Sequence, residues 1–226
     1  MERGLRAAPS PGGGRVTGQL NSAHLGMTEI GTFRESDARD LAPRLLGWTL
    51  ISRIGGEEVA GRIVETEAYL DASDPASHAA TRGGMTSRNR RMFGPGGTAY
   101  VYFVYGRHWC FNVVAGPEGS PGAVLVRALE PLGGTEVMLR RRGGREPLAS
   151  GPARLCEALG IDGAFDGHDL SRPPLRLECG GVAAGEVAVS GRIGVSRAER
   201  LPLRFYIRGN PHVSTGPHEP AASGVA

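Results

Sequence analysis

The chain contains no lysine, so all 26 of its basic side chains are arginines. Without lysine there is no side-chain amine that could form a Schiff base with an aldehyde or an exposed sugar carbon. Arginine binds phosphate through paired hydrogen bonds and stacks on planar groups, which suits nucleic acid. A genomic base composition that replaces Lys by Arg would leave the same pattern, and the net charge of +3 is only mildly basic.

Long hydrophobic runs are also missing, and the first residues lead into Pro and Gly instead of an apolar signal core. We therefore expect no membrane segment and a cytoplasmic protein. The three cysteines are scattered and lack CxxC spacing, so neither a disulfide framework nor a zinc site is indicated. The pair His108 and Cys110 lacks the further ligands that a metal site needs.

A length of 226 residues suits one domain with a fair-sized core. Residues 1–32 are rich in Gly, Pro, Ser and Arg and show little periodicity, so we expect a disordered extension, in which Met27 could be the functional start. The polar residues 215–226 predict a disordered tail. The folded domain is expected over residues 33–214.

Local patterns predict a mixture of helices and strands. Ser36 is expected to cap a helix that Gly47 ends, with Pro43 restricting it to its second half. Two further helices are expected at 134–142 and 152–159. The expected strands are 48–54 and 58–69, joined by Gly55-Gly56, then 98–105, 107–115, 123–129 and short strands within 175–208.

Apolar and aromatic residues alternate from Thr98 to Gly106, which holds three of the five tyrosines. An ordinary core strand would show the same pattern, but flat rings beside arginines also suit stacking on nucleic-acid bases. Strand alternation places Tyr102 and Tyr105 on opposite faces unless the chain bends near Val104. Tyr100 is expected to have a structural role.

In the run from Glu65 to Tyr69, a strand would place Glu65, Glu67 and Tyr69 on one face, with successive carboxylates about 7 Å apart. Two carboxylates at that spacing suit cleavage of a glycosidic bond. A solvated acidic strand face is the alternative, although the preceding Ile63 and Val64 favour partial burial. His78, Asn112 and Arg127, taken singly, are polar groups of a kind that usually has a structural role.

Several motifs occur together in the order and spacing of one family. The motifs are 62–69 (RIVETEAY), 87–90 (SRNR), 92–94 (MFG), 100–102 (YVY) with 105–106 (YG), 126–131 (VRALEP), 150–152 (SGP) with 155–156 (LC), and 202–206 (PLRFY). Through them the chain resembles the alkyladenine (3-methyladenine) DNA glycosylases of the mammalian type, here as a bacterial member, over roughly residues 35–214.

The resemblance implies roles for individual residues. Glu67 corresponds to the general base that activates water, which leaves Glu65 as a supporting residue and removes the paired-carboxylate mechanism. Arg127 corresponds to the arginine that helps to hold this water, and Tyr105 to the side chain that wedges into the duplex.

Tyr69, His78 and Tyr102 correspond to the pocket for the flipped base, and Asn112 to a residue that excludes normal guanine. DNA backbone contacts are expected from Arg88, Arg90 and Arg107; Arg107 departs from the apolar residue that the family often has there.

The resemblance further implies an α+β fold, with a curved and mainly antiparallel sheet, flanking helices and a protruding hairpin. We expect a monofunctional, cofactor-free and metal-free glycosylase, acting as a monomer at the nucleoid on double-stranded DNA with alkylated or deaminated purines. A non-catalytic module that binds damaged DNA is the alternative. A carbohydrate glycosidase would place stacking tryptophans near its acids, but Trp48 and Trp109 lie in no supporting motif.

Overall fold

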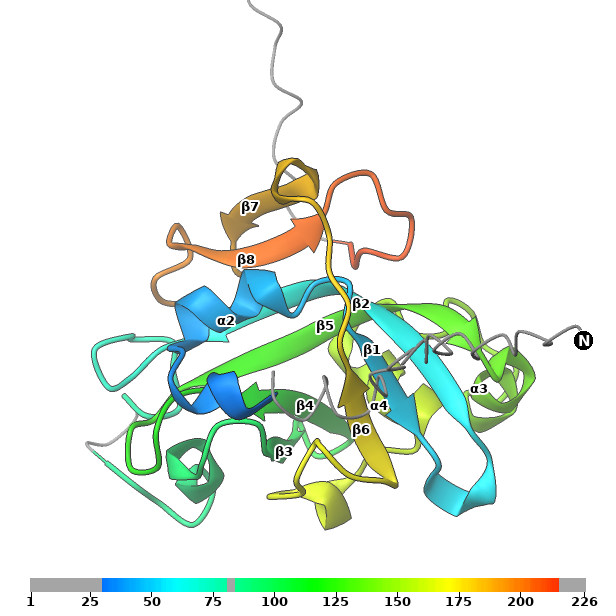
Figure 1. Ribbon diagram of the computed structural model, residues 1–226, viewed down its shortest axis with the longest axis horizontal. Helices are drawn as coiled ribbons and strands as arrows, with labels where there is room; N and C mark the ends of the chain where they lie inside the picture. Colours follow the sequence, from blue (N-terminus) through cyan, green and yellow to red (C-terminus); the bar gives the residue numbers. More distant parts are fainter. Residues whose placement is uncertain (1–29, 81–83, 216–226) are drawn as a thin grey trace, which may run out of the picture.

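The computed structural model describes residues 30–80 and 84–215, which form one mixed α+β domain (Figure 1). Most of the expected N-terminal extension and nearly all of the expected C-terminal tail lie outside the described residues. Ile30, inside the range expected for the extension, is buried and joins the core. Eight strands of the described chain form a single antiparallel sheet that curls into a half-barrel, as the resemblance implied.

Strand β2 (Val59–Tyr69) is the strand on which the sheet is built. One of its edges pairs with β5 (Ala123–Gly133) along its length. The other edge pairs first with β1 (Thr49–Ser52) and then with β8 (Pro202–Ile207). The register with β5 shifts on both sides of Glu65, and such β-bulges bend a strand and increase its twist. The bend therefore falls at the two glutamates.

The remaining strands extend the sheet at its edges. The hairpin of β3 (Ala99–Val104) and β4 (His108–Val114) continues from β5, β6 (Leu175–Glu178) pairs with β1, and β7 (Val187–Gly191) pairs with β8. The expected hairpins are confirmed to within a few residues. The expected strand 123–129 continues to Gly133, because β2 supplies hydrogen-bond partners beyond the apolar run.

Helices flank the sheet. Helix α2 (Ala38–Arg44) packs against β2, β5 and β8, while α3 (Thr135–Arg141) packs against α4 (Pro152–Leu159), which in turn packs against β4 and β5. The bounds of α4 agree with the prediction, since Pro152 opens the helix and Gly160, with φ of 72°, ends it.

The expectation for the first helix was wrong in two respects. Asp37 caps it by accepting a hydrogen bond from Asp40 N–H (2.9 Å), whereas Ser36 Oγ donates to the Thr32 carbonyl. Pro43 lies inside the helix and does not restrict it to its second half. A proline removes only its own N–H, and the bond from Leu45 N–H to the Leu41 carbonyl still closes the last turn.

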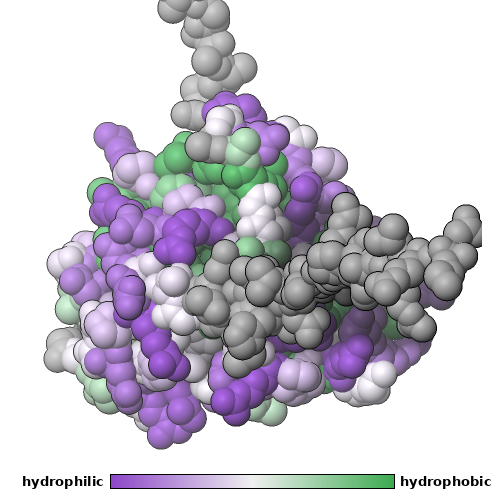
Figure 2. Space-filling model, in the orientation of Figure 1, coloured by the Kyte–Doolittle hydropathy of each residue, from purple (hydrophilic) through white to green (hydrophobic). Residues whose placement is uncertain are grey.

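On the face shown in Figure 2, apolar side chains gather where α2 meets the β7–β8 hairpin, around a groove that includes Pro43, Val187, Val189 and Phe205. The main core lies between the helices and the sheet, and Leu41 of α2 is fully buried in it. Burial of α2 against β2 ties the helix to the strand that carries both glutamates.

Replacing Leu41 by Ala should lower the free energy of unfolding by about 2–5 kcal/mol, because it leaves a cavity in the core. The matched control is Leu139→Ala, since Leu139 of α3 is 37% exposed and can lose its side chain with a change of about 1 kcal/mol or less. Urea denaturation followed by circular dichroism measures both values. Equal losses in the two variants would contradict the packing described for α2.

Candidate active site

Two glutamates, Glu65 and Glu67, project from the bend of β2 into the interior, and both side chains are fully buried. Arg127 of β5 joins them: its Nε lies 3.1 Å from Glu65 Oε1 and its Nη1 lies 3.2 Å from Glu67 Oε2. The shared partner shows that the two acids face the same side, as strand alternation predicted. A buried charge is tolerated when it is paired and hydrogen-bonded, and Arg127 provides that pairing for both.

Glu65 is held by four donors. Besides Arg127, its Oε1 accepts from Arg204 Nε (2.7 Å) and from Ser214 Oγ (3.0 Å), while its Oε2 accepts from Ser214 N–H (2.8 Å). These donors fix the carboxylate in one orientation, in which it binds Arg127. Glu65 is therefore suited to holding Arg127 in place.

Glu67 meets three donors from the part of the chain that the structure describes. Its Oε1 accepts from Ile193 N–H (2.7 Å), and its Oε2 accepts from the Tyr69 hydroxyl (2.9 Å) and faces Arg127. One acceptor position of Oε1 is therefore left among these partners. Of the two glutamates of β2, Glu67 is the one that bonds to the Tyr69 hydroxyl.

Burial raises the pKa of Glu67 above the ordinary value of a glutamate, and Glu65 adds to the rise. Arg127, Ile193 N–H and the Tyr69 hydroxyl act in the opposite direction without cancelling it. A carboxylate whose pKa is raised towards neutrality is a better proton acceptor than an ordinary one, and such groups gather at active sites. Glu67 therefore has the electrostatic setting of a general base.

An aromatic hollow adjoins Glu67, with about 250 Å³ of empty space including its opening. The pocket residues expected from the resemblance all line it: Tyr69 from β2, Tyr102 from β3, Asn112 from β4, and His78 from the loop after β2. The structure adds further lining residues that the sequence did not single out for this place: Ala76, Met92, Tyr100 and Ala123.

Tyr100 is buried, and it also lines the hollow and contacts His78. Its hydroxyl lies 2.8 Å from His78 Nδ1, and its carbonyl accepts a hydrogen bond from Asn112 Nδ2 (2.9 Å). Burial, and then the charge of Arg88, lowers the pKa of His78, so the imidazole is neutral near pH 7. Tyr100 thus connects two walls of the hollow in addition to its structural role.

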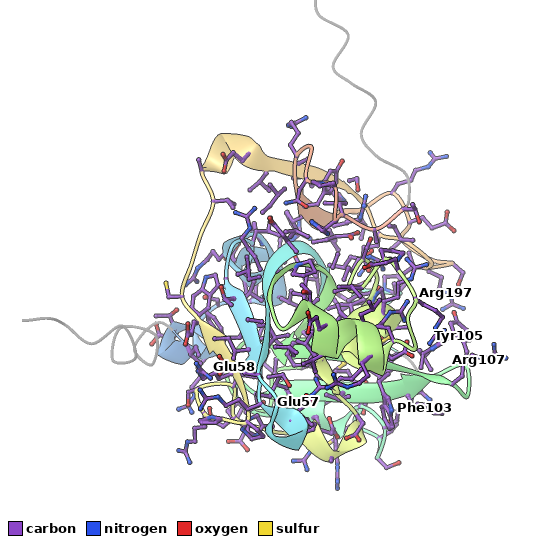
Figure 3. The ribbon with its side chains drawn as sticks, turned by 90° about the vertical axis from the view of Figure 1, so that its right-hand side faces the viewer. Glu57, Glu58, Phe103, Tyr105, Arg107 and Arg197 are labelled. Atoms are coloured by element: carbon purple, nitrogen blue, oxygen red, sulfur yellow. The ribbon has the colours of Figure 1, made fainter. Side chains whose placement is uncertain are left out.

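Three residues, Tyr105-Gly106-Arg107, connect β3 to β4, and a hydrogen bond from Arg107 N–H to the Val104 carbonyl (3.2 Å) closes a turn with Tyr105 and Gly106 at its centre. Both residues have positive φ, 53° for Tyr105 and 67° for Gly106, as a type I′ turn requires. The chain therefore reverses directly after Val104, and the Tyr105 side chain stands at the tip, 85% exposed. Figure 3 shows Tyr105, Arg107 and Phe103 on the same side of the molecule as Arg197.

The arginines expected at the DNA backbone, Arg88, Arg90 and Arg107, are all exposed. Arg88 also has contacts within the protein, since its Nη2 donates to the Phe103 carbonyl (3.0 Å) and its guanidinium carbon lies 5.8 Å from the centre of the Tyr102 ring. The structure thus places Arg88 between the hairpin and the hollow, and Arg107 beside the hairpin tip.

Three partners of Glu65 and Glu67 were missed from the sequence, namely Ile193, Arg204 and Ser214, and so was Arg192, which precedes Ile193. The available signal was an arginine inside an otherwise apolar strand at 202–207, and another between glycines and apolar residues at 191–195. Within residues 30–80 and 84–215, His, Cys, Asp and Glu side chains form no group of three that could hold a metal ion. No helix in those ranges is long and apolar enough to span a membrane.

Comparison with known proteins identifies the family of the chain. The model of the methylpurine-DNA glycosylase family matches residues 32–211. A protein of Methanoculleus marisnigri named "Putative 3-methyladenine DNA glycosylase" is 47% identical over 196 residues, which cover 83% of this chain and 99% of the relative. Proteins with the same name from Koribacter versatilis and Carboxydothermus hydrogenoformans are each 46% identical over 80% of this chain, with 90% and 96% of their own lengths covered. The chain therefore belongs to the methylpurine-DNA glycosylase family.

Proposed function

We propose that this protein removes alkylated and deaminated purines from duplex DNA by hydrolysing the N-glycosidic bond with water activated by Glu67. The substrates are of the class of 3-methyladenine, 7-methylguanine, hypoxanthine and ethenoadenine. The observation that carries the proposal is a buried carboxylate that is hydrogen-bonded to Tyr69, a residue that lines the aromatic hollow. The family to which the chain belongs supplies the DNA glycosylase role.

Glu67 is proposed to accept the proton of a water that attacks C1′ of the flipped nucleotide. The bonding electrons of the glycosidic bond leave with the purine, and the new C1′–O bond forms from the water. Arg127 lies 3.2 Å from Glu67 and would help to hold this water while keeping the carboxylate in place. Because Glu65 already binds Arg127 and Arg204, the guanidinium of Arg127 cannot move away when Glu67 becomes protonated.

The hollow is proposed to receive the base after it leaves the stack. Alkylation at N3 or N7 places positive charge on the purine, which strengthens its attraction to the rings of Tyr69 and Tyr102 and makes it a better leaving group. Neutral lesions need protonation as well. Asn112 is fixed by its bond to the Tyr100 carbonyl, and such a fixed wall would exclude the exocyclic amino group of normal guanine.

Tyr105 is proposed to enter the duplex where the damaged base has left, because it is the most protruding aromatic residue of the hairpin tip. Arg107 would add a phosphate or groove contact beside it. Since the chain has no lysine, no lysine amine is available to cleave the strand after base release, so we expect an abasic site as the product.

Replacing Glu67 by Gln should abolish base release while sparing DNA binding, because the amide keeps the shape of the side chain but cannot accept the proton. A duplex with one hypoxanthine, treated with alkali after incubation, reports release, and a gel-shift assay reports binding. Glu57→Gln is the matched control, since Glu57 lies on the surface away from Tyr105 (Figure 3) and should retain wild-type activity. Release by the Glu67 variant at the wild-type rate would refute the base assignment. A wild type that binds the duplex but releases no damaged purine would favour the binding-module alternative.

Replacing Tyr105 by Ala should slow excision from duplex DNA on the order of 10- to 100-fold, because the ring no longer offsets the stacking lost on flipping. Tyr105→Phe keeps the ring and should stay close to wild type. On a single-stranded oligonucleotide the Ala variant should lose far less, because there is no gap to fill. Equal losses on the two substrates would argue against insertion of Tyr105 into the duplex.

A further inference from the structure

A second fully buried ion pair lies next to the candidate site, between Arg192 and Asp74. Arg192 Nη1 lies 2.6 Å from Asp74 Oδ2, and Nη2 lies 2.8 Å from Oδ1, so the two groups meet in the parallel arrangement that is strongest for arginine and carboxylate. Both side chains have no exposed surface. Neither residue lines the hollow or bonds to Glu67 through its side chain, so the proposed chemistry does not use the pair directly.

Asp74 organises the loop that follows β2. Its Oδ2 accepts from Leu70 N–H (3.1 Å) and its Oδ1 from Ala76 N–H (3.0 Å). Ala76 and His78, both in this loop, line the hollow. The position of Asp74 therefore sets where one wall of the hollow stands.

Arg192 reaches back to β2 from the segment after β7. The same Nη1 that binds Asp74 also donates to the Ala68 carbonyl (3.0 Å), and the guanidinium carbon lies 4.8 Å from the centre of the Tyr69 ring. One guanidinium thus contacts the loop, the backbone of β2 and a ring that lines the hollow.

The residues before and after Arg192 show how its contacts affect Glu67. Ile193, the next residue, provides the N–H that binds Glu67 Oε1 at 2.7 Å. Gly191, the preceding residue, is pressed against the carbonyl of Glu199, since a Cβ at position 191 would lie 2.2 Å from that oxygen. The chain at 191–193 is therefore held on one side by backbone packing and on the other by the ion pair.

We propose that Arg192 is a positioning residue for the glycosylase reaction: by binding Asp74, Ala68 and Tyr69 at once, it fixes Ile193 N–H against Glu67 and the His78 loop against the hollow. The inference rests on the proposed function. A lysine in its place would keep a positive charge but could not make the paired bonds to Asp74 while also reaching the Ala68 carbonyl.

The pH dependence of the reaction distinguishes positioning from a general loss of stability. When the Ile193 N–H bond is lost, the carboxylate of Glu67 loses a stabilising donor, so its pKa rises and the acidic limb of the rate profile moves to higher pH. Arg192 also interacts with Glu67 through its charge, and lysine keeps that charge, so an upward shift in the lysine variant reports the lost positioning. The other titratable or charged groups that face Glu67 are unchanged in this variant and leave the limb in place. They are Glu65 and Tyr69 on β2, Cys110 on β4 and Arg127 on β5.

The test measures single-turnover release of hypoxanthine from a duplex over a range of pH, below the melting temperature of each variant. Arg192→Lys and Arg192→Gln should lower the rate constant on the order of 10- to 100-fold, as small misplacements of catalytic groups do, and should shift the acidic limb upward. The double variant Asp74→Asn with Arg192→Gln leaves no unpaired buried charge. Its release of hypoxanthine should still be slow, and a slow rate in this variant separates lost positioning from misfolding caused by a buried charge.

Arg142→Gln is the control, because Arg142 is also buried and ion-paired, to Glu157, but lies at the end of α3. It should lower the melting temperature and leave the rate and its pH profile as in the wild type. Wild-type rates and profiles in the Arg192→Lys and double variants would overturn the inference while leaving the proposed function intact. A wild type that releases no base would overturn the proposed function, and this inference with it.

Discussion

The burial of charge at the bend of β2 is the constraint on which the other features of the site depend. Three carboxylates, those of Glu65, Glu67 and Asp74, are buried together with the guanidiniums of Arg127, Arg192 and Arg204. An unpaired charge in a protein interior costs several kcal/mol, which is comparable with the whole stability of a domain. The arginines of β5, β8 and the segment after β7 must therefore lie where they neutralise these carboxylates, and Ser214 adds two hydrogen bonds to Glu65.

Within this network the two glutamates of β2 differ only in their partners. Glu65 is bound by four donors from Arg127, Arg204 and Ser214, whereas Glu67 is bound by three, one of which is the hydroxyl of Tyr69, a residue that lines the hollow. Glu65 holds Arg127, and Arg127 faces the acid that is connected to the hollow. Two residues of the same type, two positions apart, thereby become a support and a candidate base.

Much of the fold was readable from local sequence, because alternation and turn residues act over a few positions. Helix α4 was predicted at its observed bounds, and the hairpins were predicted from their strands and glycines. The sequence did not show which buried side chains would bind each other. Arg204 meets Glu65 across 139 residues, and only the register of β2 with β8 brings them together. Spacing alone presented Glu65 and Glu67 as equals, and family resemblance, not periodicity, singled out Glu67 and the pocket residues.

The turn at the tip of the β3–β4 hairpin has a consequence for how the protein would search DNA. Tyr105 adopts a left-handed backbone conformation that is uncommon for a residue with a side chain, and the hairpin ladder and the Val104–Arg107 bond keep it there. That conformation is selected when the protein folds, before any DNA is met. Under the proposed insertion of Tyr105, the DNA has to deform around a tip whose conformation is already set, so the energy needed to open a site would reflect the stacking and pairing of that site. Weakly stacked or mispaired positions would then open first.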